Sequence, residues 1–173
     1  MKIALIGTHG TGKTALAHQI VGNLKEKGIN ADFLGEIARD CPLPINEKQT
    51  REASEWIIYT QYIKEIEKLK SPEKILVCDR SVLDGYVYRV NLFGSDALLK
   101  KFIKSKIKTY DLLFRIPLDK TKLKEDGIRS TSPEFQQAID NQFDILEKEF
   151  GIITIKTSNH EQIVRSILEN YTP

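Results

Sequence analysis

The clearest chemical signal in the sequence is an octapeptide near its start, which reads Gly7-Thr8-His9-Gly10-Thr11-Gly12-Lys13-Thr14. It satisfies the G-x-x-x-x-G-K-[S/T] pattern of a phosphate-binding loop at every fixed position. The glycines let the backbone turn so that several N–H groups point at a polyphosphate. Lys13 then reaches the outer phosphates, and Thr14 offers its hydroxyl to magnesium. We expect all eight residues to form a nucleotide-binding loop, in which His9 fills a variable position rather than acting as a base.

A carboxylate follows an apolar run later in the chain. Residues 75–78 are Ile, Leu, Val and Cys, and they lead directly into Asp79 and Arg80. An apolar strand that ends in Asp places a carboxylate beside the magnesium ion of a bound nucleotide. We therefore predict that Thr14 and Asp79 hold the metal and that Asp79 and Arg80 act with Lys13 in catalysis. The alternative is an Asp that only ends a strand.

A second carboxylate, Glu36, follows the expected strand at residues 31–34, and Arg39 comes three residues later. In a parallel sheet this position faces the same cleft as Gly7 and Asp79, because ligands bind at the carboxyl ends of the strands. A carboxylate there is suited to orienting an attacking hydroxyl or accepting its proton. We predict a catalytic role for Glu36, and the alternative is a solvated glutamate in a surface loop.

Residues 119–130 carry many charges and few hydrophobic side chains, which is typical of a functional loop or lid. Arg129 follows a glycine that provides a bend, and an arginine that closes over transferring phosphates stabilises the developing charge. We predict a catalytic role for Arg129. The alternative, a solvated charged linker, is the preferred interpretation for Lys120, Lys122 and Lys124.

The elements that must position these residues alternate along the chain. Short apolar runs predict strands at residues 2–6, 31–34, 74–78, 111–116 and 152–155. Helical spacing and capping residues predict helices at residues 13–27, 47–70, 81–93, 96–108, 133–150 and 161–170. Strands that alternate with helices predict an α/β fold with a mainly parallel sheet and helices on both faces. In the long second helix, Trp56, Tyr59, Ile63 and Ile66 are expected to form the apolar side. Trp56 and Tyr59 are interpreted as core residues, with stacking on a base as the alternative.

Composition restricts the kind of protein. The 173 residues suit one domain, 1–173, with a lid at 119–130. A net charge of +2 gives no case for a nucleic-acid partner. The apolar runs are of strand length, so no membrane span is expected, and the first strand leaves no room for a secretory leader. Two widely separated cysteines, Cys41 and Cys78, fit a reducing cytoplasm. The oligomeric state is left open.

Several segments together resemble small P-loop kinases of the AAA-like ATP-binding group that includes the nicotinamide riboside kinase domain. More distantly, the chain resembles thymidylate and deoxyribonucleoside kinases. Besides the phosphate loop, the segments that carry the resemblance are Glu36-Ile37-Ala38-Arg39, Asp79-Arg80-Ser81, Leu83-Asp84-Gly85 and Asp126-Gly127-Ile128-Arg129. The resemblance implies a three-layer P-loop NTPase fold with sheet order 2-3-1-4-5. It also implies that Asp79 lies near the metal and that Arg80 and Arg129 contact phosphates.

The sequence therefore predicts an enzyme that uses ATP with Mg²⁺ to phosphorylate a small nucleoside, a nucleotide or a related hydroxyl compound. The alternative is a P-loop NTPase with a regulatory role, which needs a positioned water and no acceptor pocket. A guanine-nucleotide switch is disfavoured, because the chain has no N-K-x-D tetrapeptide to read guanine. A kinase would build its acceptor pocket from Glu36, Arg39, the long helix and residues 79–88.

Overall fold

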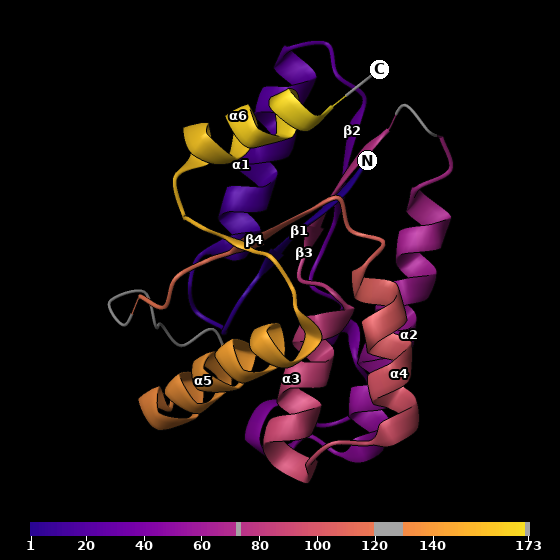
Figure 1. Ribbon diagram of the computed structural model, residues 1–173, viewed down its shortest axis with the longest axis vertical. Helices are drawn as coiled ribbons and strands as arrows, with labels where there is room; N and C mark the ends of the chain where they lie inside the picture. The colour runs from indigo at the N-terminus through magenta and orange to yellow at the C-terminus, as the bar shows by residue number, and fades with distance from the viewer. Residues whose placement is uncertain (72–73, 120–129, 172–173) are drawn as a thin grey trace.

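Five parallel strands form the centre of the protein in a computed structural model, which describes residues 1–71, 74–119 and 130–171 (Figure 1). The strands lie in the order β2-β3-β1-β4-β5, which confirms the predicted order 2-3-1-4-5. β1 lies at the centre, paired with β3 on one side and β4 on the other. Their bounds are β1 Lys2–Ile6, β2 Ala31–Leu34, β3 Ile75–Asp79, β4 Leu112–Arg115 and β5 Ile155–Lys156.

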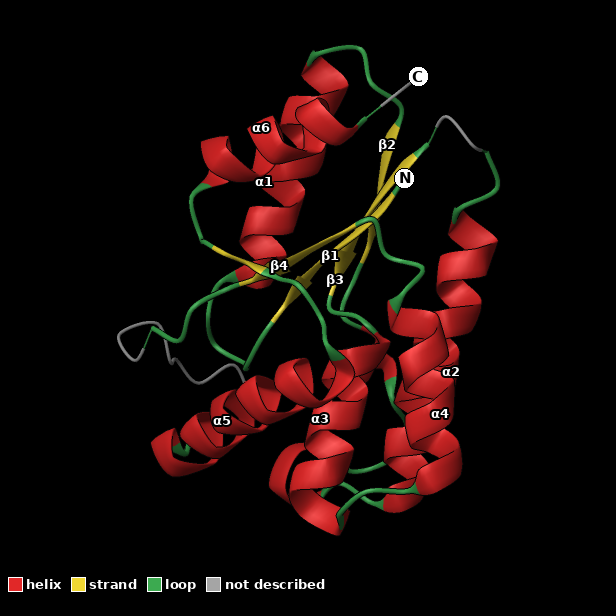
Figure 2. Cartoon of the chain, in the orientation of Figure 1, coloured by secondary structure: helices red, strands yellow, loops and turns green. Residues whose placement is uncertain are grey.

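Helices cover both faces of this sheet (Figure 2). On one face lie α1 Lys13–Glu26 and α6 His160–Asn170; on the other lie α2 Arg51–Lys68, α3 Val82–Phe93, α4 Ala97–Ile107 and α5 Pro133–Phe150. Alternate residues of β1 feed the two cores, because successive side chains of a strand point to opposite faces. Ile3 and Leu5 pack toward α1 and α6, whereas Ala4 and Ile6 pack toward the other helices. None of the described helices is long and apolar enough to cross a membrane.

The predicted helix at residues 47–70 is shorter in the structure, and its buried side is different. α2 begins after Thr50, whose side chain accepts a hydrogen bond from the Ala53 N–H, and a short 3-10 helix, Asn46–Lys48, precedes it. The expected apolar side was wrong, because Tyr59, Ile63 and Ile66 are 45%, 50% and 55% exposed. The helix instead buries Ala53, Ser54, Ile57, Ile58, Gln61 and Glu65.

The close approach of α3 explains this reversal. A Cβ on Gly85 would lie 2.7 Å from Cγ1 of Ile58, so only a glycine lets the two helices pack at this distance. The polar residues Gln61 and Glu65 are tolerated inside because both are hydrogen-bonded. Trp56 is partly buried against the core.

Two further differences lie toward the end of the chain. β5 occupies Ile155–Lys156 rather than residues 152–155, since the backbone leaves α5 through left-handed Gly151 and reaches β4 only at Ile155. Ile153, expected inside the strand, is 90% exposed. Residues 120–129 of the expected lid, including Arg129, lie outside the described residues.

Candidate active site

The glycine-rich loop joins β1 to α1. Gly7, Gly10 and Gly12 have φ values of 137°, 72° and 84°, which a side chain would strain. At Gly7 the space is closed as well, because a Cβ would lie 2.7 Å from Nη1 of Arg115. The Lys13 side chain folds over this loop, where Nζ donates hydrogen bonds to the Thr8 carbonyl and, at 3.1 Å, to Thr11 Oγ1. The loop, the start of α1 and a buried ammonium thus form one cradle.

The surroundings of Lys13 disfavour the charged form of its side chain. Burial and then the neighbouring Arg80 lower the pKa of Lys13 to about 7, against the attraction of Asp79, Asp84 and Glu36. An anion in the cradle would restore the ammonium form, because an opposite charge at this distance favours ionisation. The loop is therefore built to receive negative charge.

Thr14 and Asp79 lie together at the end of β3. The Thr14 hydroxyl donates to Oδ2 of Asp79 at 2.5 Å, and the Asp79 side chain is almost fully buried. Burial and the nearby Glu36 raise the pKa of Asp79, which means that they disfavour its ionised form. A cation bound here would stabilise that ionised carboxylate. Mg²⁺ usually takes one or two protein oxygens and completes its shell with phosphates and water. The two side chains fit that requirement.

We expect Asp79→Asn to weaken magnesium-dependent nucleotide binding while the fold stays intact. The amide keeps the shape of the carboxylate and loses the charge that a hard cation requires. A magnesium titration of ATP binding measures the effect, and Asp32→Asn, at a surface salt bridge with Lys68 and Lys74, is the matched control. An unchanged magnesium dependence in Asp79→Asn would mean that this residue only ends a strand.

Glu36 is held between two arginines. Its Oε1 accepts from Arg80 Nε at 2.6 Å and its Oε2 accepts from Arg39 Nε at 3.1 Å. Burial alone would raise the pKa of Glu36, but Arg80, Lys13 and Arg39 together lower it to about 2. Glu36 is thus ionised at neutral pH. It is suited to accepting a hydrogen bond from a hydroxyl and is a weak acceptor for a whole proton.

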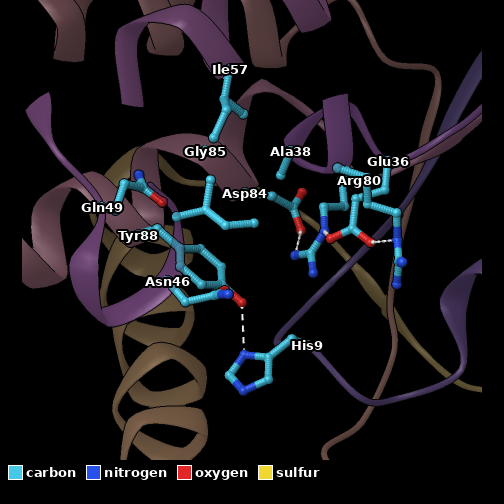
Figure 3. A pocket seen from close by; sticks show the side chains of 12 residues that line it. His9, Glu36, Ala38, Asn46, Gln49, Ile57, Arg80, Asp84, Gly85 and Tyr88 are labelled. Carbon is cyan, nitrogen blue, oxygen red and sulfur yellow. Dashed lines mark hydrogen bonds and ion pairs between the residues drawn. The ribbon is translucent and has the colours of Figure 1, made fainter. Parts of the chain in front are cut away.

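A second cavity lies beside Glu36 and Arg80 (Figure 3). It holds about 510 Å³ of empty space, part of which is open to solvent. Its wall comes from the β2–α2 segment, α2, α3 and the phosphate loop: His9, Glu36, Ala38, Arg39, Ile45, Asn46, Gln49, Ile57, Arg80, Asp84, Gly85 and Tyr88. Glu36 and Arg80 also line the smaller cleft formed by residues 10–14 and Asp79. These two side chains therefore stand at the junction of the two spaces.

His9 does more than fill the loop, which corrects the sequence-based expectation. Its ring is 2% exposed, and Nδ1 is 2.9 Å from the Tyr88 hydroxyl (Figure 3). Burial, followed by the charges of Arg80 and Lys13, lowers the pKa of His9 to about 4. The ring is therefore neutral at pH 7, and it ties the phosphate loop to α3 at the wall of the second cavity.

Most of this wall lies in the segments from which the sequence predicted an acceptor pocket, namely Glu36, Arg39, the long helix and residues 79–88; Ala38, Ile45 and Asn46 were not included. Asp84 accepts the Gly7 N–H at 3.1 Å and also completes the capping box of α3 with Ser81. The Ser-x-x-Asp spacing could have indicated the cap but not the contact with the loop. Gln49, just before α2, and Tyr88, on α3, lie within these predicted segments, and the packing of α2 on α3 brings them to one cavity. Trp56 and Tyr59 do not line it.

A glycine-rich phosphate cradle at the carboxyl end of a central parallel strand defines a P-loop nucleotide-binding protein. Residues 2–162 match the model of the AAA domain family, and the chain belongs to that family. Among curated proteins, none matches the chain. The family and the fold confirm the resemblance seen in the sequence.

Solved structures share this fold. The NadR protein, solved in complex with NR, superposes with a TM-score of 0.76 at 18% identity, covering 99% of this chain and 51% of NadR. This chain thus spans about half the length of that protein. Deoxyadenosine kinase from M. mycoides with bound dATP gives a TM-score of 0.67 at 16% identity, covering 98% of this chain and 100% of the kinase. The same enzyme with dCMP and dCDP gives 0.62 at 16% identity, with coverages of 98% and 97%.

Proposed function

We propose that the protein transfers the γ-phosphoryl group of ATP to a hydroxyl of a small, uncharged, nucleoside-like molecule. The observation that carries this proposal is the position of Glu36 and Arg80, which line both the phosphate cleft and the larger cavity. Phosphoryl transfer requires a donor and an acceptor that meet in line, with positive charge around the transferred group. A hydrolase needs only a water at this point and has no use for a second cavity beside the phosphate cleft.

The charged groups of the site favour a mechanism in which Glu36 orients the acceptor hydroxyl over one in which Glu36 removes its proton. Glu36 would accept a hydrogen bond from the acceptor hydroxyl and hold its oxygen toward the phosphate, while Lys13 and Arg80 face the developing charge. Magnesium held by Thr14 and Asp79 would neutralise charge on the outer phosphates. Because the transition state is loose, the hydroxyl proton need not be removed early, which suits a carboxylate with a pKa of about 2.

The larger cavity favours an uncharged acceptor over a nucleotide. Among the described residues that line it, two carboxylates, Glu36 and Asp84, balance two guanidinium groups, Arg39 and Arg80. Both arginines donate to Glu36, so the carboxylate offsets the positive charge that an acceptor phosphate would meet. Apolar walls with a few amides, Asn46 and Gln49, suit a flat ring with a polar edge. The name of the deoxyadenosine kinase neighbour agrees with this substrate class.

A panel of acceptors tests the proposal. Nucleosides and nucleoside monophosphates would each be incubated with Mg²⁺ and either ATP or GTP, and the products followed by ³¹P NMR against a reaction without acceptor. We expect a nucleoside to become a monophosphate and to stimulate turnover with ATP. Hydrolysis at one constant rate with every acceptor would assign the protein to the NTPases. A preference for monophosphates would overturn the neutral-acceptor part of the proposal.

A further inference from the structure

Arg80 has an unusual backbone conformation. Its φ is +86°, in the left-handed region that non-glycine residues seldom adopt. The turn places the Arg80 side chain between the two cavities, where Nε donates to Glu36 and Nη1 donates to the Gly7 carbonyl at 3.3 Å. Such a conformation persists only when its surroundings hold it firmly.

The peptide groups on either side of Ser81 are held from outside the active site. The Arg80 carbonyl accepts a hydrogen bond from Nε2 of Gln61 on α2 at 3.3 Å. The N–H of Val82 donates to the hydroxyl of Tyr110, which precedes β4, at 3.1 Å. Two distant segments therefore fix the turn that carries Arg80.

A single carboxylate organises both of these contacts. Oε1 of Glu65 accepts from Gln61 Nε2 at 2.8 Å and also from the Tyr110 hydroxyl. Its Oε2 is paired with Nζ of Lys2 at 2.8 Å, so the buried charge is compensated. All four side chains are at most 8% exposed, and none of them lines either cavity of the active site.

We propose that Gln61, oriented by Glu65, is a positioning residue that keeps Arg80 at the junction between donor and acceptor, while Tyr110, bonded to the same carboxylate, holds the turn at Val82. The inference rests on the proposed phosphoryl transfer for its kinetic consequence, but the placement of Arg80 is a property of the protein alone. Gln61 touches neither ligand cavity, so its influence must pass through the turn at Arg80 and Ser81.

Gln61→Met keeps the length of the side chain and removes both hydrogen bonds. We expect kcat to fall at least about tenfold while the Kd of MgATP stays within about threefold. Ile103→Val, a change in the core of α4, is the control for lost stability and should keep its kcat. In an Arg80→Lys background, Gln61→Met should have little further effect on kcat. If Gln61→Met lowers kcat by the same factor in the natural protein and in the Arg80→Lys variant, the proposal is overturned.

A readout without turnover separates this inference from the proposed function. The Arg80 Nε–H, buried against Glu36, should give a slowly exchanging ¹⁵N-edited NMR signal that Arg80→Lys removes. In Gln61→Met the signal should shift and exchange faster. If Gln61→Met folds poorly, Tyr110→Phe tests the same network. An unchanged signal would overturn the positioning role, whereas a changed signal without any phosphorylated acceptor would contradict only the proposed function.

Discussion

Lys13→Met should abolish phosphoryl transfer and weaken nucleotide binding at least about 10²-fold, since it removes a buried charge that faces the phosphates. Met fills a similar volume, so the loop should keep its form. Isothermal titration with MgATP measures the binding, and Lys25→Met, an exposed lysine at the end of α1, is the matched control. Full turnover by a folded Lys13→Met protein would contradict the assignment of this loop.

The same substitution should change how the stability of the ligand-free protein depends on pH. The pKa of Lys13 is about 7 in the folded protein and 10.5 when unperturbed, so the unfolded chain binds the extra proton between these values. The contribution of Lys13 to stability therefore rises with pH from about 7 to 10.5. The Tm of Lys13→Met relative to the natural protein should be highest below pH 7 and should decline through this interval. A difference in Tm between the two proteins that is constant with pH would contradict the lowered pKa of Lys13.

Local patterns were sufficient for much of the fold. The phosphate loop, the strand before it and the helix after it were predictable because each depends on residues close in sequence: apolar β1, the turning glycines and the amphipathic α1. The sheet order followed from the resemblance to P-loop kinases. The caps of α3 and α5, Ser81 and Ser132, were also readable from short-range spacing.

The parts that could not be predicted depend on contacts between distant segments. The prediction of the buried side of α2 was wrong, because hydrophobicity alone predicts that Tyr59 and Ile63 are buried. The structure instead buries Gln61 and Glu65 and supplies them with hydrogen-bonding partners. The sequence placed Glu36 near the cleft, but its lowered pKa depends on Lys13, Arg39 and above all Arg80, which is 44 positions away in the chain. Charges set by tertiary neighbours are invisible to local patterns.

Glu36→Gln should lower acceptor phosphorylation about 10²-fold or more, within the range measured for groups that act on the reacting hydroxyl. The amide keeps the size of the side chain and loses the charge that holds Arg80 and Arg39. MgATP binding should persist, because the phosphate loop is unchanged. Glu67→Gln, at an exposed glutamate of α2, is the matched control and should leave kcat unaltered.

The pH profile shows which role Glu36 has. Since its pKa is about 2, Glu36 stays ionised across the range where the protein can be assayed, and its protonation should produce no acidic limb in kcat between about pH 5 and pH 8. An acidic limb that disappears in Glu36→Gln would show instead that this carboxylate takes the proton. Slow hydrolysis of ATP in the absence of acceptor should survive Glu36→Gln, because it does not use the larger cavity. If hydrolysis is abolished and no acceptor stimulates turnover, Glu36 positions water, and the site belongs to an NTPase.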